Sequence, residues 1–251
     1  LANVLNGADY TLTIQGMPGA DLAGSGIMRS FDVAGCCAMI SGPAERRRDA
    51  VHQLVGLDQP LILFEEKMEL PGADFAVVRQ DDRGGGRQIA EHLLARGVDD
   101  ILAVVPAEPW PQIEARLAGL QDGIAAAGGG ARLAVIRSAS ESFADVQAVV
   151  AAQLASAPLP GAVFGGNDPI ATAAMFLLLD RGIAVPEQVR VVGFNGFEAH
   201  RHARPRLSTV VSPAYALGET AGRAMLSRLE TGAFAHAEWL LPVHFEAGTT
   251  S

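Results

Sequence analysis

The short strand-like runs of this chain are apolar at nearly every position, and helical patterns separate them. The run at 101–105, Ile-Leu-Ala-Val-Val, has no polar face. A strand of that kind is covered on both sides, as in parallel sheets that helices flank. The pattern therefore predicts an α/β fold with doubly wound parallel sheets. The expected strands are 10–14, 36–40, 61–64, 75–78, 101–105, 132–136, 162–164, 189–194 and 240–245.

A polar stretch at 79–83 separates two successive α/β series, which predicts two similar lobes. Three crossings, near 79–81, 209–212 and 233–237, would join them. The first lobe would comprise 1–79 and 211–234, and the second 80–210 and 235–251. Ligands of such sheets bind outside the carboxyl ends of the strands, so a cleft between the lobes is the expected site. The expected helices are 21–31, 44–55, 84–95, 112–127, 141–154, 169–181 and 213–229.

Composition excludes several classes of protein. Hydrophobic residues make up 49% and charged residues 19%, which favours a packed core over disorder. The net charge of −9 argues against a basic nucleic-acid face on this chain. No run approaches the roughly 18 apolar residues of a membrane span, and the start LANVLNGADY does not resemble a signal peptide. Cys36 and Cys37 are adjacent, so we expect two small buried strand residues in a reducing compartment.

Catalytic motifs are missing from the sequence. The glycines at 84–86 are not followed by Lys-Ser or Lys-Thr, no GxGxxG opens a βαβ unit, and no GxSxG elbow occurs. The spacing of Glu198, His200 and His202 suits a solvated loop better than a metal site. We therefore expect no catalytic residue, no metal and no cofactor, and an enzyme on a doubly wound fold is the less favoured alternative.

Small polar residues follow two of the expected strands. Asn167 and Asp168 end the run at 162–164, directly before a helix that Pro169 opens. An Asn at a strand end can place its amide in a ligand site, whereas either residue could cap the helix. Asp168 suits the cap better, so Asn167 is the predicted ligand residue. Asn195 follows 189–194, and with Gly196 it also forms a favourable turn pair.

The segment 160–211 carries the most specific pattern of the chain. Its elements are Asn167-Asp168, Gly182, Pro186, Val191-Val192-Gly193-Phe194 and Pro205-Arg206-Leu207-Ser208-Thr209-Val210. The stretches 91–97, 116–120 and 241–250 agree with it in order. Together these motifs resemble the effector-binding core of the lactose-repressor/galactose-repressor (LacI/GalR) family of bacterial transcription regulators.

The resemblance implies a periplasmic-binding-protein-like type I fold, with two lobes and three crossover strands. It further implies a cytoplasmic homodimer that binds a small sugar or sugar derivative between the lobes. Operator DNA would be bound through an N-terminal helix-turn-helix segment that is absent from this chain, as is the usual first strand. A periplasmic sugar-binding protein of an ABC transporter shares the fold and is the alternative function.

The resemblance also assigns candidate ligand residues. Arg116 opens an Arg-x-x-Gly motif and would clamp hydroxyl or carboxylate groups with its guanidinium. Asn195 replaces the family's Asp, which removes a charge, adds donors and points away from a plain neutral sugar. Glu65 matches a cleft residue, although an exposed acid at a strand end is equally consistent. Trp110 and Phe143 are candidate cleft walls, although aromatic residues more often belong to a core.

Overall fold

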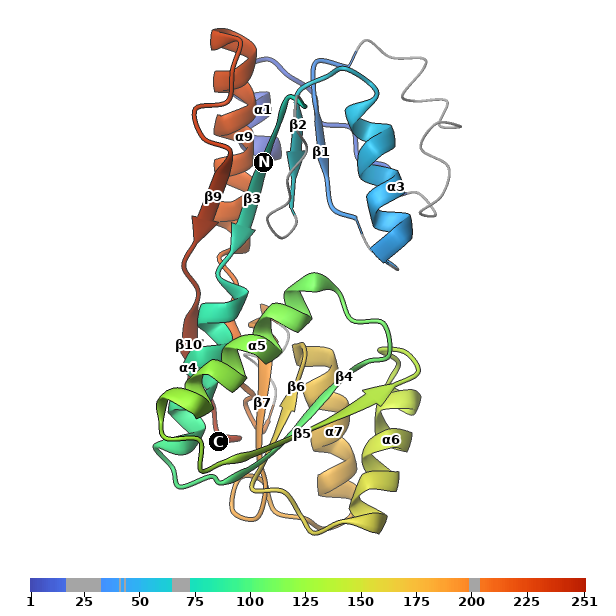
Figure 1. Ribbon diagram of the computed structural model, residues 1–251, viewed down its shortest axis with the longest axis vertical. Coiled ribbons are helices and arrows are strands. Elements are labelled where there is room, and N and C mark those ends of the chain that lie inside the picture. Colours follow the sequence, from blue (N-terminus) through green and yellow to red (C-terminus); the bar gives the residue numbers. More distant parts are fainter. Residues whose placement is uncertain (17–32, 41, 43, 65–72, 199–203) are drawn as a thin grey trace. The chain divides into compact units, whose positions relative to one another are not determined.

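The computed structural model describes residues 1–16, 33–40, 42, 44–64, 73–198 and 204–251. They form two compact units, each with its own sheet (Figure 1). Unit 1 comprises Leu1–Gln80 and Pro213–Leu241, and unit 2 comprises Asp81–Ser212 and Pro242–Ser251. Each unit is therefore assembled from segments that are far apart in the sequence.

Unit 2 contains a six-stranded sheet in the order β10-β8-β7-β6-β4-β5. Its strands are parallel except for β10, which pairs antiparallel with β8. The strands are β4 (Asp100–Pro106), β5 (Arg132–Ser138), β6 (Ala162–Gly165), β7 (Arg190–Asn195), β8 (Ser208–Val211) and β10 (His244–Glu246). The helices are α4 (Asp82–Leu94), α5 (Pro111–Ala126), α6 (Phe143–Ser156) and α7 (Asp168–Asp180).

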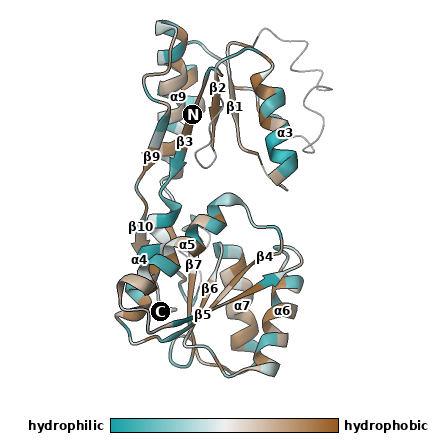
Figure 2. Ribbon diagram, viewed as in Figure 1, coloured by the Kyte–Doolittle hydropathy of each residue, from teal (hydrophilic) through white to brown (hydrophobic). Residues whose placement is uncertain are grey.

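The central strands of unit 2 are hydrophobic along their length, because both faces of the sheet are covered (Figure 2). On one face, Phe164 and Phe194 pack in a cluster with residues of α4 and α5. On the other face, Val163 and Val191 pack with residues of α6 and α7. The predicted doubly wound parallel sheet is confirmed, and its carboxyl-terminal edge collects the starts of the helices that follow the strands.

Unit 1 contains a four-stranded parallel sheet in the order β1-β2-β3-β9. Helix α3 contributes to a core cluster with β1, β2 and β3, whereas α9 contributes to a second cluster with β2, β3 and β9. The strands are β1 (Cys36–Ala38), β2 (Leu61–Leu63), β3 (Phe75–Gln80) and β9 (Glu238–Leu241). The helices are α1 (Ala2–Asn6), α3 (Ala44–Val55) and α9 (Ala214–Thr231).

Five sequence-based expectations for these elements differ from the structure or lie outside it. Residues 10–14 do not form a strand, and Ile14 is 85% exposed. The expected run 240–245 is two strands, since β9 pairs with β3 in unit 1 and β10 with β8 in unit 2. Residues 238–241, assigned from the sequence to the second lobe, thus belong to unit 1. The segment near 209–212 is not only a crossing but the full strand β8, and the expected helix 21–31 lies outside the described residues.

Helices α4 and α5 pack at very short distance because glycine lies at their contact. A Cβ on Gly86 would lie 2.1 Å from the carbonyl oxygen of Arg116. A Cβ on Gly119 would lie 1.9 Å from the carbonyl oxygen of Arg83. The glycines at 84–86, which do not match a phosphate-binding loop, thus include a helix-packing residue. This contact fixes the position of α5, which carries Arg116, relative to α4.

The two cysteines are free thiols on β1, as the strand prediction expected, and both are half-buried. Burial, together with the neighbouring Cys36, raises the pKa of the Cys37 thiol to about 12, and burial also raises the pKa of Cys36. Only the thiolate is a strong nucleophile. At about pH 8 we expect Cys37 of the folded protein to react with Ellman's reagent more than about tenfold more slowly than in urea, and Cys36 to react more slowly as well. Equal rates in the folded and unfolded protein would contradict this expectation.

His92 of α4 contacts the C-terminal segment of unit 2. Its Nε2 lies 2.7 Å from Ser251 Oγ, and its ring lies 4.1 Å from that of Phe245. Burial, helped by the charges of Arg96 and Arg190, lowers the pKa of His92 from 6.5 to about 4. Between these values the unfolded chain binds more protons than the folded chain, so stability falls as the pH falls.

Replacement of this histidine tests that pH dependence. In His92→Gln, the free energy of unfolding should depend less on pH between about 4 and 6.5 than in the parent chain. Urea titrations at several pH values in this window measure the difference. His52 on α3 lies in unit 1, so His52→Gln is a matched control. An unchanged pH dependence in His92→Gln would contradict the assignment.

Candidate functional site

Polar side chains gather at the carboxyl-terminal edge of the unit 2 sheet. Asn167 directly follows β6, Asn195 ends β7, and Arg116 lies on α5, the helix after β4. Hydrogen bonds connect Arg116 with Asn195, and Asn167 with Glu141, which lies in the loop after β5. This edge is where parallel α/β sheets bind ligands. The structure thus brings together three of the residues singled out from the sequence.

Arg116 is the most buried charged member of this group, with 5% of its surface exposed. Its Nε donates to Asp82 Oδ1 at 2.7 Å, and its Nη1 donates to the carbonyl oxygen of Gly166 at 2.7 Å. Its Nη2 donates to Asn195 Oδ1 at 3.1 Å, and its guanidinium lies 3.8 Å from the centre of the Phe194 ring. Arg116 therefore joins α4, β6 and β7, so it is more than the open clamp that the sequence predicted.

Asn167 caps helix α7, and the expectation that Asp168 would be the better cap is wrong. Asn167 Oδ1 accepts a hydrogen bond from Ile170 N at 3.0 Å. Its Nδ2 donates to Glu141 Oε2 at 2.9 Å. Asn167 is thus both helix cap and member of the polar group, because its amide oxygen caps α7 and its amide nitrogen donates to Glu141.

Asp168 is fully buried and holds neighbouring elements together. Its Oδ1 accepts from Thr209 Oγ1 at 2.6 Å, and its Oδ2 accepts from Phe197 N at 2.9 Å. These bonds tie the start of α7 to β8 and to the segment after β7. The carboxylate of Asp168 thus joins elements of unit 2.

Asn195 has a backbone φ of +111°, in a region that residues other than glycine rarely adopt. It is followed by Gly196 at φ +66°, so the expected turn is present together with the contact to Arg116. Residues held in sparsely populated backbone regions often cluster at functional sites. The turn interpretation of Asn195 is confirmed, and its role as a ligand residue stays a prediction.

The two aromatic candidates lie at helix starts on the same edge of unit 2. Trp110 is the N-cap residue of α5 and is 38% exposed. Phe143 is the first residue of α6 and is 44% exposed; its ring centre lies 6.0 Å from that of Phe176 on α7. Neither belongs to the buried core. Glu65 lies outside the described residues, and its role stays a prediction.

Glu141 is the member of the group that the sequence analysis did not single out. The sequence pattern predicts a helix that starts at Glu141, whereas α6 begins at Phe143. Ser142 is the N-cap, and its Oγ accepts from Asp145 N at 3.2 Å. The Ser-x-x-Asp spacing was the available signal, because such a cap leaves the residue before it in the loop after β5.

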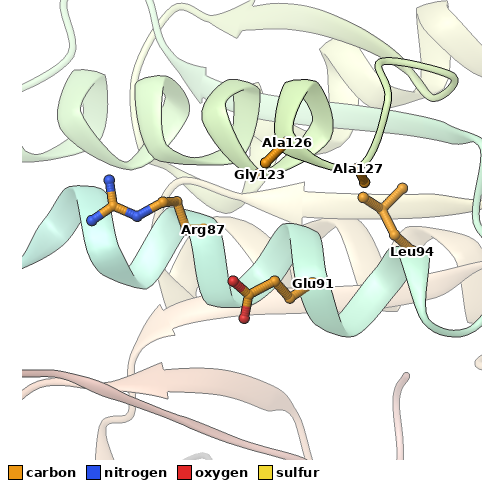
Figure 3. A pocket seen from close by; sticks show the side chains of 6 residues that line it. All are labelled: Arg87, Glu91, Leu94, Gly123, Ala126 and Ala127. Atoms are coloured by element: carbon orange, nitrogen blue, oxygen red, sulfur yellow. The ribbon is translucent and has the colours of Figure 1, made fainter.

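A separate shallow groove lies between α4 and α5 (Figure 3). Arg87 and Glu91 of α4 line it, together with Leu94, Gly123, Ala126 and Ala127. The groove exists because Gly123 and Ala126 of α5, and Ala127 directly after it, have small side chains or none.

Within the part of the chain that the structure describes, no three or more His, Cys, Asp or Glu side chains group as metal ligands. No described helix is long and apolar enough to span a bilayer.

Comparison with known proteins matches residues 90–251 to the model of the periplasmic binding protein-like domain. The chain is 34% identical over 143 residues to the HTH-type transcriptional regulator GntR of Pseudomonas aeruginosa, covering 57% of this chain and 41% of that protein. It is 26% identical over 170 residues to the HTH-type transcriptional regulator CelR of Thermobifida fusca, covering 68% and 50%. The chain thus spans about half or less of these relatives.

A solved structure with the same fold is the LacI family transcriptional regulator from Enterococcus faecium with bound ribose. It matches with a TM-score of 0.83 at 23% identity, covering 99% of this chain and 90% of that one. At this level of identity the likeness establishes the fold.

Proposed function

Because the chain belongs to the periplasmic binding protein-like domain family, we propose that it is the effector-binding part of a LacI/GalR-type transcriptional regulator. The effector is a small sugar or sugar derivative, and its binding controls the affinity of the whole regulator for operator DNA. The protein works in the cytoplasm and without catalysis. The curated relatives are transcriptional regulators, which favours this function over a transporter's solute-binding protein.

The observation that carries the proposal is the polar group of Arg116, Asn167, Asn195 and Glu141 at the carboxyl-terminal edge of the unit 2 sheet. Guanidinium, amide and carboxylate groups are those that recognise hydroxyl and acid groups of sugars. Half-exposed Trp110 and Phe143 at the same edge can cover apolar faces of a ligand. Glu65 remains a further proposed ligand residue.

Operator DNA is bound through an N-terminal segment outside these 251 residues. The net charge of −9 makes this chain a poor partner for DNA, so a separate basic segment is needed. The regulator acts as a homodimer, because a pair of DNA-binding segments matches a symmetric operator. An effector that couples to DNA binding by roughly 1–3 kcal/mol changes operator affinity about 5- to 150-fold.

A ligand screen by thermal shift tests the binding part of the proposal. Neutral sugars and sugar acids are added to the 251-residue chain, and a true ligand raises the melting temperature by mass action. Asn195→Ala should abolish the shift, whereas Ala at the exposed Asn6 of α1 should preserve it. Arg116 is a poor choice for this test because its removal also affects folding. An undiminished shift in Asn195→Ala would contradict the proposed site.

The regulatory part is tested with the complete gene product. Fluorescence anisotropy on labelled upstream DNA, with and without the ligand found in the screen, measures the dissociation constant in each state. We expect a change of about 5- to 150-fold, in either direction. Sedimentation of the same protein should show a dimer. DNA binding that the ligand leaves unchanged would contradict a regulatory role.

A further inference from the structure

The hydrogen-bond polarity of the site points to an acid, and we propose that the ligand is a polyhydroxy carboxylate. Its carboxylate group lies at the Arg116–Asn195 end of the site, and its hydroxyl groups lie toward Glu141. This inference rests on the proposed function and narrows it from sugars in general to sugar acids. It makes Asn195 the residue that sets the specificity.

The amide of Asn195 has a fixed orientation. Nη2 of Arg116 is a donor, so the atom that it meets at 3.1 Å must be the amide oxygen. The buried guanidinium is itself held by Asp82 and by the carbonyl oxygen of Gly166, so it cannot turn to release that oxygen. The Nδ2 of Asn195 forms no hydrogen bond with any residue that the structure describes. Asn195 therefore offers a ligand two N–H donors, while its oxygen already accepts a hydrogen bond from Arg116.

The amide of Asn167 is fixed by the same logic. The backbone N–H of Ile170 is a donor, so the atom that it meets at 3.0 Å must be the oxygen. The Nδ2 of Asn167 then faces Glu141, to which it donates one of its two N–H groups at 2.9 Å. A ligand can meet the second N–H. Flipping this amide would set a donor against the helix start and an oxygen against a carboxylate, so both neighbours oppose it.

The donor character extends to Arg116, whose side chain has five N–H groups and no acceptor. Three of them are used by Asp82, Gly166 and Asn195. Among the described side chains Arg116, Asn167 and Asn195, the groups that have no hydrogen-bond partner are thus N–H donors, and both amide oxygens already accept one hydrogen bond. The acceptor of the group is Glu141, in the loop after β5, whose carboxylate can accept from hydroxyl groups. The site has a donor end and an acceptor end.

A carboxylate fits the donor end better than a hydroxyl does. A hydroxyl group is donor and acceptor, and at this end its own O–H would find only amide oxygens that already accept a hydrogen bond. A carboxylate only accepts, and its hydrogen bonds to N–H groups are charge-assisted. The position of Asn195 decides this, because an Asp there would present oxygen and favour hydroxyl groups. The acceptor end, at Glu141, matches the hydroxyl groups of the same ligand.

Matched pairs of ligands test the inference with the 251-residue chain. The aldonates gluconate, galactonate, mannonate and ribonate differ from the alditols glucitol, galactitol, mannitol and ribitol only in a carboxylate that replaces a terminal CH₂OH. Isothermal titration calorimetry at neutral pH compares each pair, and neutral aldoses and sugar phosphates complete the panel. We expect at least one aldonate to bind about 10- to 150-fold more tightly than its alditol.

The variant Asn195→Asp provides the second measurement, because Asp keeps the size of the side chain and tolerates positive φ better than most residues. It should weaken aldonate binding about 10- to 150-fold and reduce the preference over the alditol. Asn6→Asp adds the same charge at an exposed residue of α1 and should leave both affinities unchanged. Circular dichroism and melting confirm that each variant is folded.

The outcomes separate the two proposals. Aldonate preference in the parent chain, lost in Asn195→Asp, supports the inference. Binding of a neutral aldose, an alditol or a sugar phosphate in preference to every aldonate overturns it and leaves the proposed function standing. Aldonate preference that survives in Asn195→Asp overturns the role of Asn195. Failure of every compound to bind would count against the proposed function as well as the inference.

Discussion

Arg116→Met is expected to destabilise unit 2 by about 3–5 kcal/mol, the usual cost of removing one partner of a buried ion pair. The side chains of Arg116 and Asp82 are 6% and 0% exposed, and their Nε–Oδ1 distance is 2.7 Å. Met retains the unbranched stem of the arginine but lacks the guanidinium group, so the carboxylate of Asp82 loses its cation. The variant also removes the bonds to Gly166 and Asn195 and the contact with Phe194.

Urea denaturation at neutral pH measures this loss, with Arg83→Met as the matched control. Arg83 pairs with Asp122 at the surface, with 57% and 34% of their side chains exposed. Solvent screens such a pair, so the control should leave the unfolding midpoint nearly unchanged. The double variant Asp82→Asn/Arg116→Met should recover part of the stability. Equal losses of stability in Arg116→Met and Arg83→Met would show that the buried ion pair stabilises the protein no more than the surface pair does.

Gly119→Ala is expected to destabilise unit 2 by about 1–3 kcal/mol or more, although alanine favours helices. In an isolated helix this change would stabilise by up to about 1 kcal/mol. Here the new methyl group would lie 1.9 Å from the carbonyl oxygen of Arg83 and 2.8 Å from its carbonyl carbon. These are backbone atoms, so α4 and α5 must move apart, and Arg116 moves with α5.

Thermal unfolding and ligand affinity together measure this effect. Gly119→Ala should lower the melting temperature and also weaken ligand binding, because the displaced α5 carries Arg116. Gly130→Ala is the control, since a Cβ there meets no atom within 4 Å and no positive φ is required. A stability of Gly119→Ala equal to or above that of the parent chain would contradict the close packing of α4 and α5.

Elements with strong periodicity could be predicted from the sequence. The helix expected at 44–55 coincides with α3, and the run expected at 162–164 is β6 without its last residue. Burial on both faces leaves a continuous apolar run, which is visible without knowledge of the fold. The run at 10–14 alternates in polarity, yet its residues find no strand to pair with, and pairing depends on distant parts of the chain.

The candidate site was less accessible to sequence reasoning. Asn167 and Asn195 could be found because they end buried strands, and Arg116 because of its resemblance to a family motif. Their hydrogen-bond partners could not, since Arg116 and Asn195 are 79 positions apart and Asn167 and Glu141 are 26 apart. Only folding brings these groups together, and the partners determine which end of each amide faces a ligand. The ligand roles of these residues stay predictions.

The discontinuity of unit 1 has a consequence for the protein during its synthesis. Strand β3 pairs with β9, which lies some 160 residues further along the chain, and α9 also comes from that later segment. A growing chain therefore exposes the open edge of β3 while nearly all of unit 2 leaves the ribosome, and unpaired strand edges invite wrong association. Unit 2 needs only β10 and the final residues to complete its own sheet. We expect a released fragment that ends at residue 212 to contain a largely folded second unit beside a first unit that proteases still cleave.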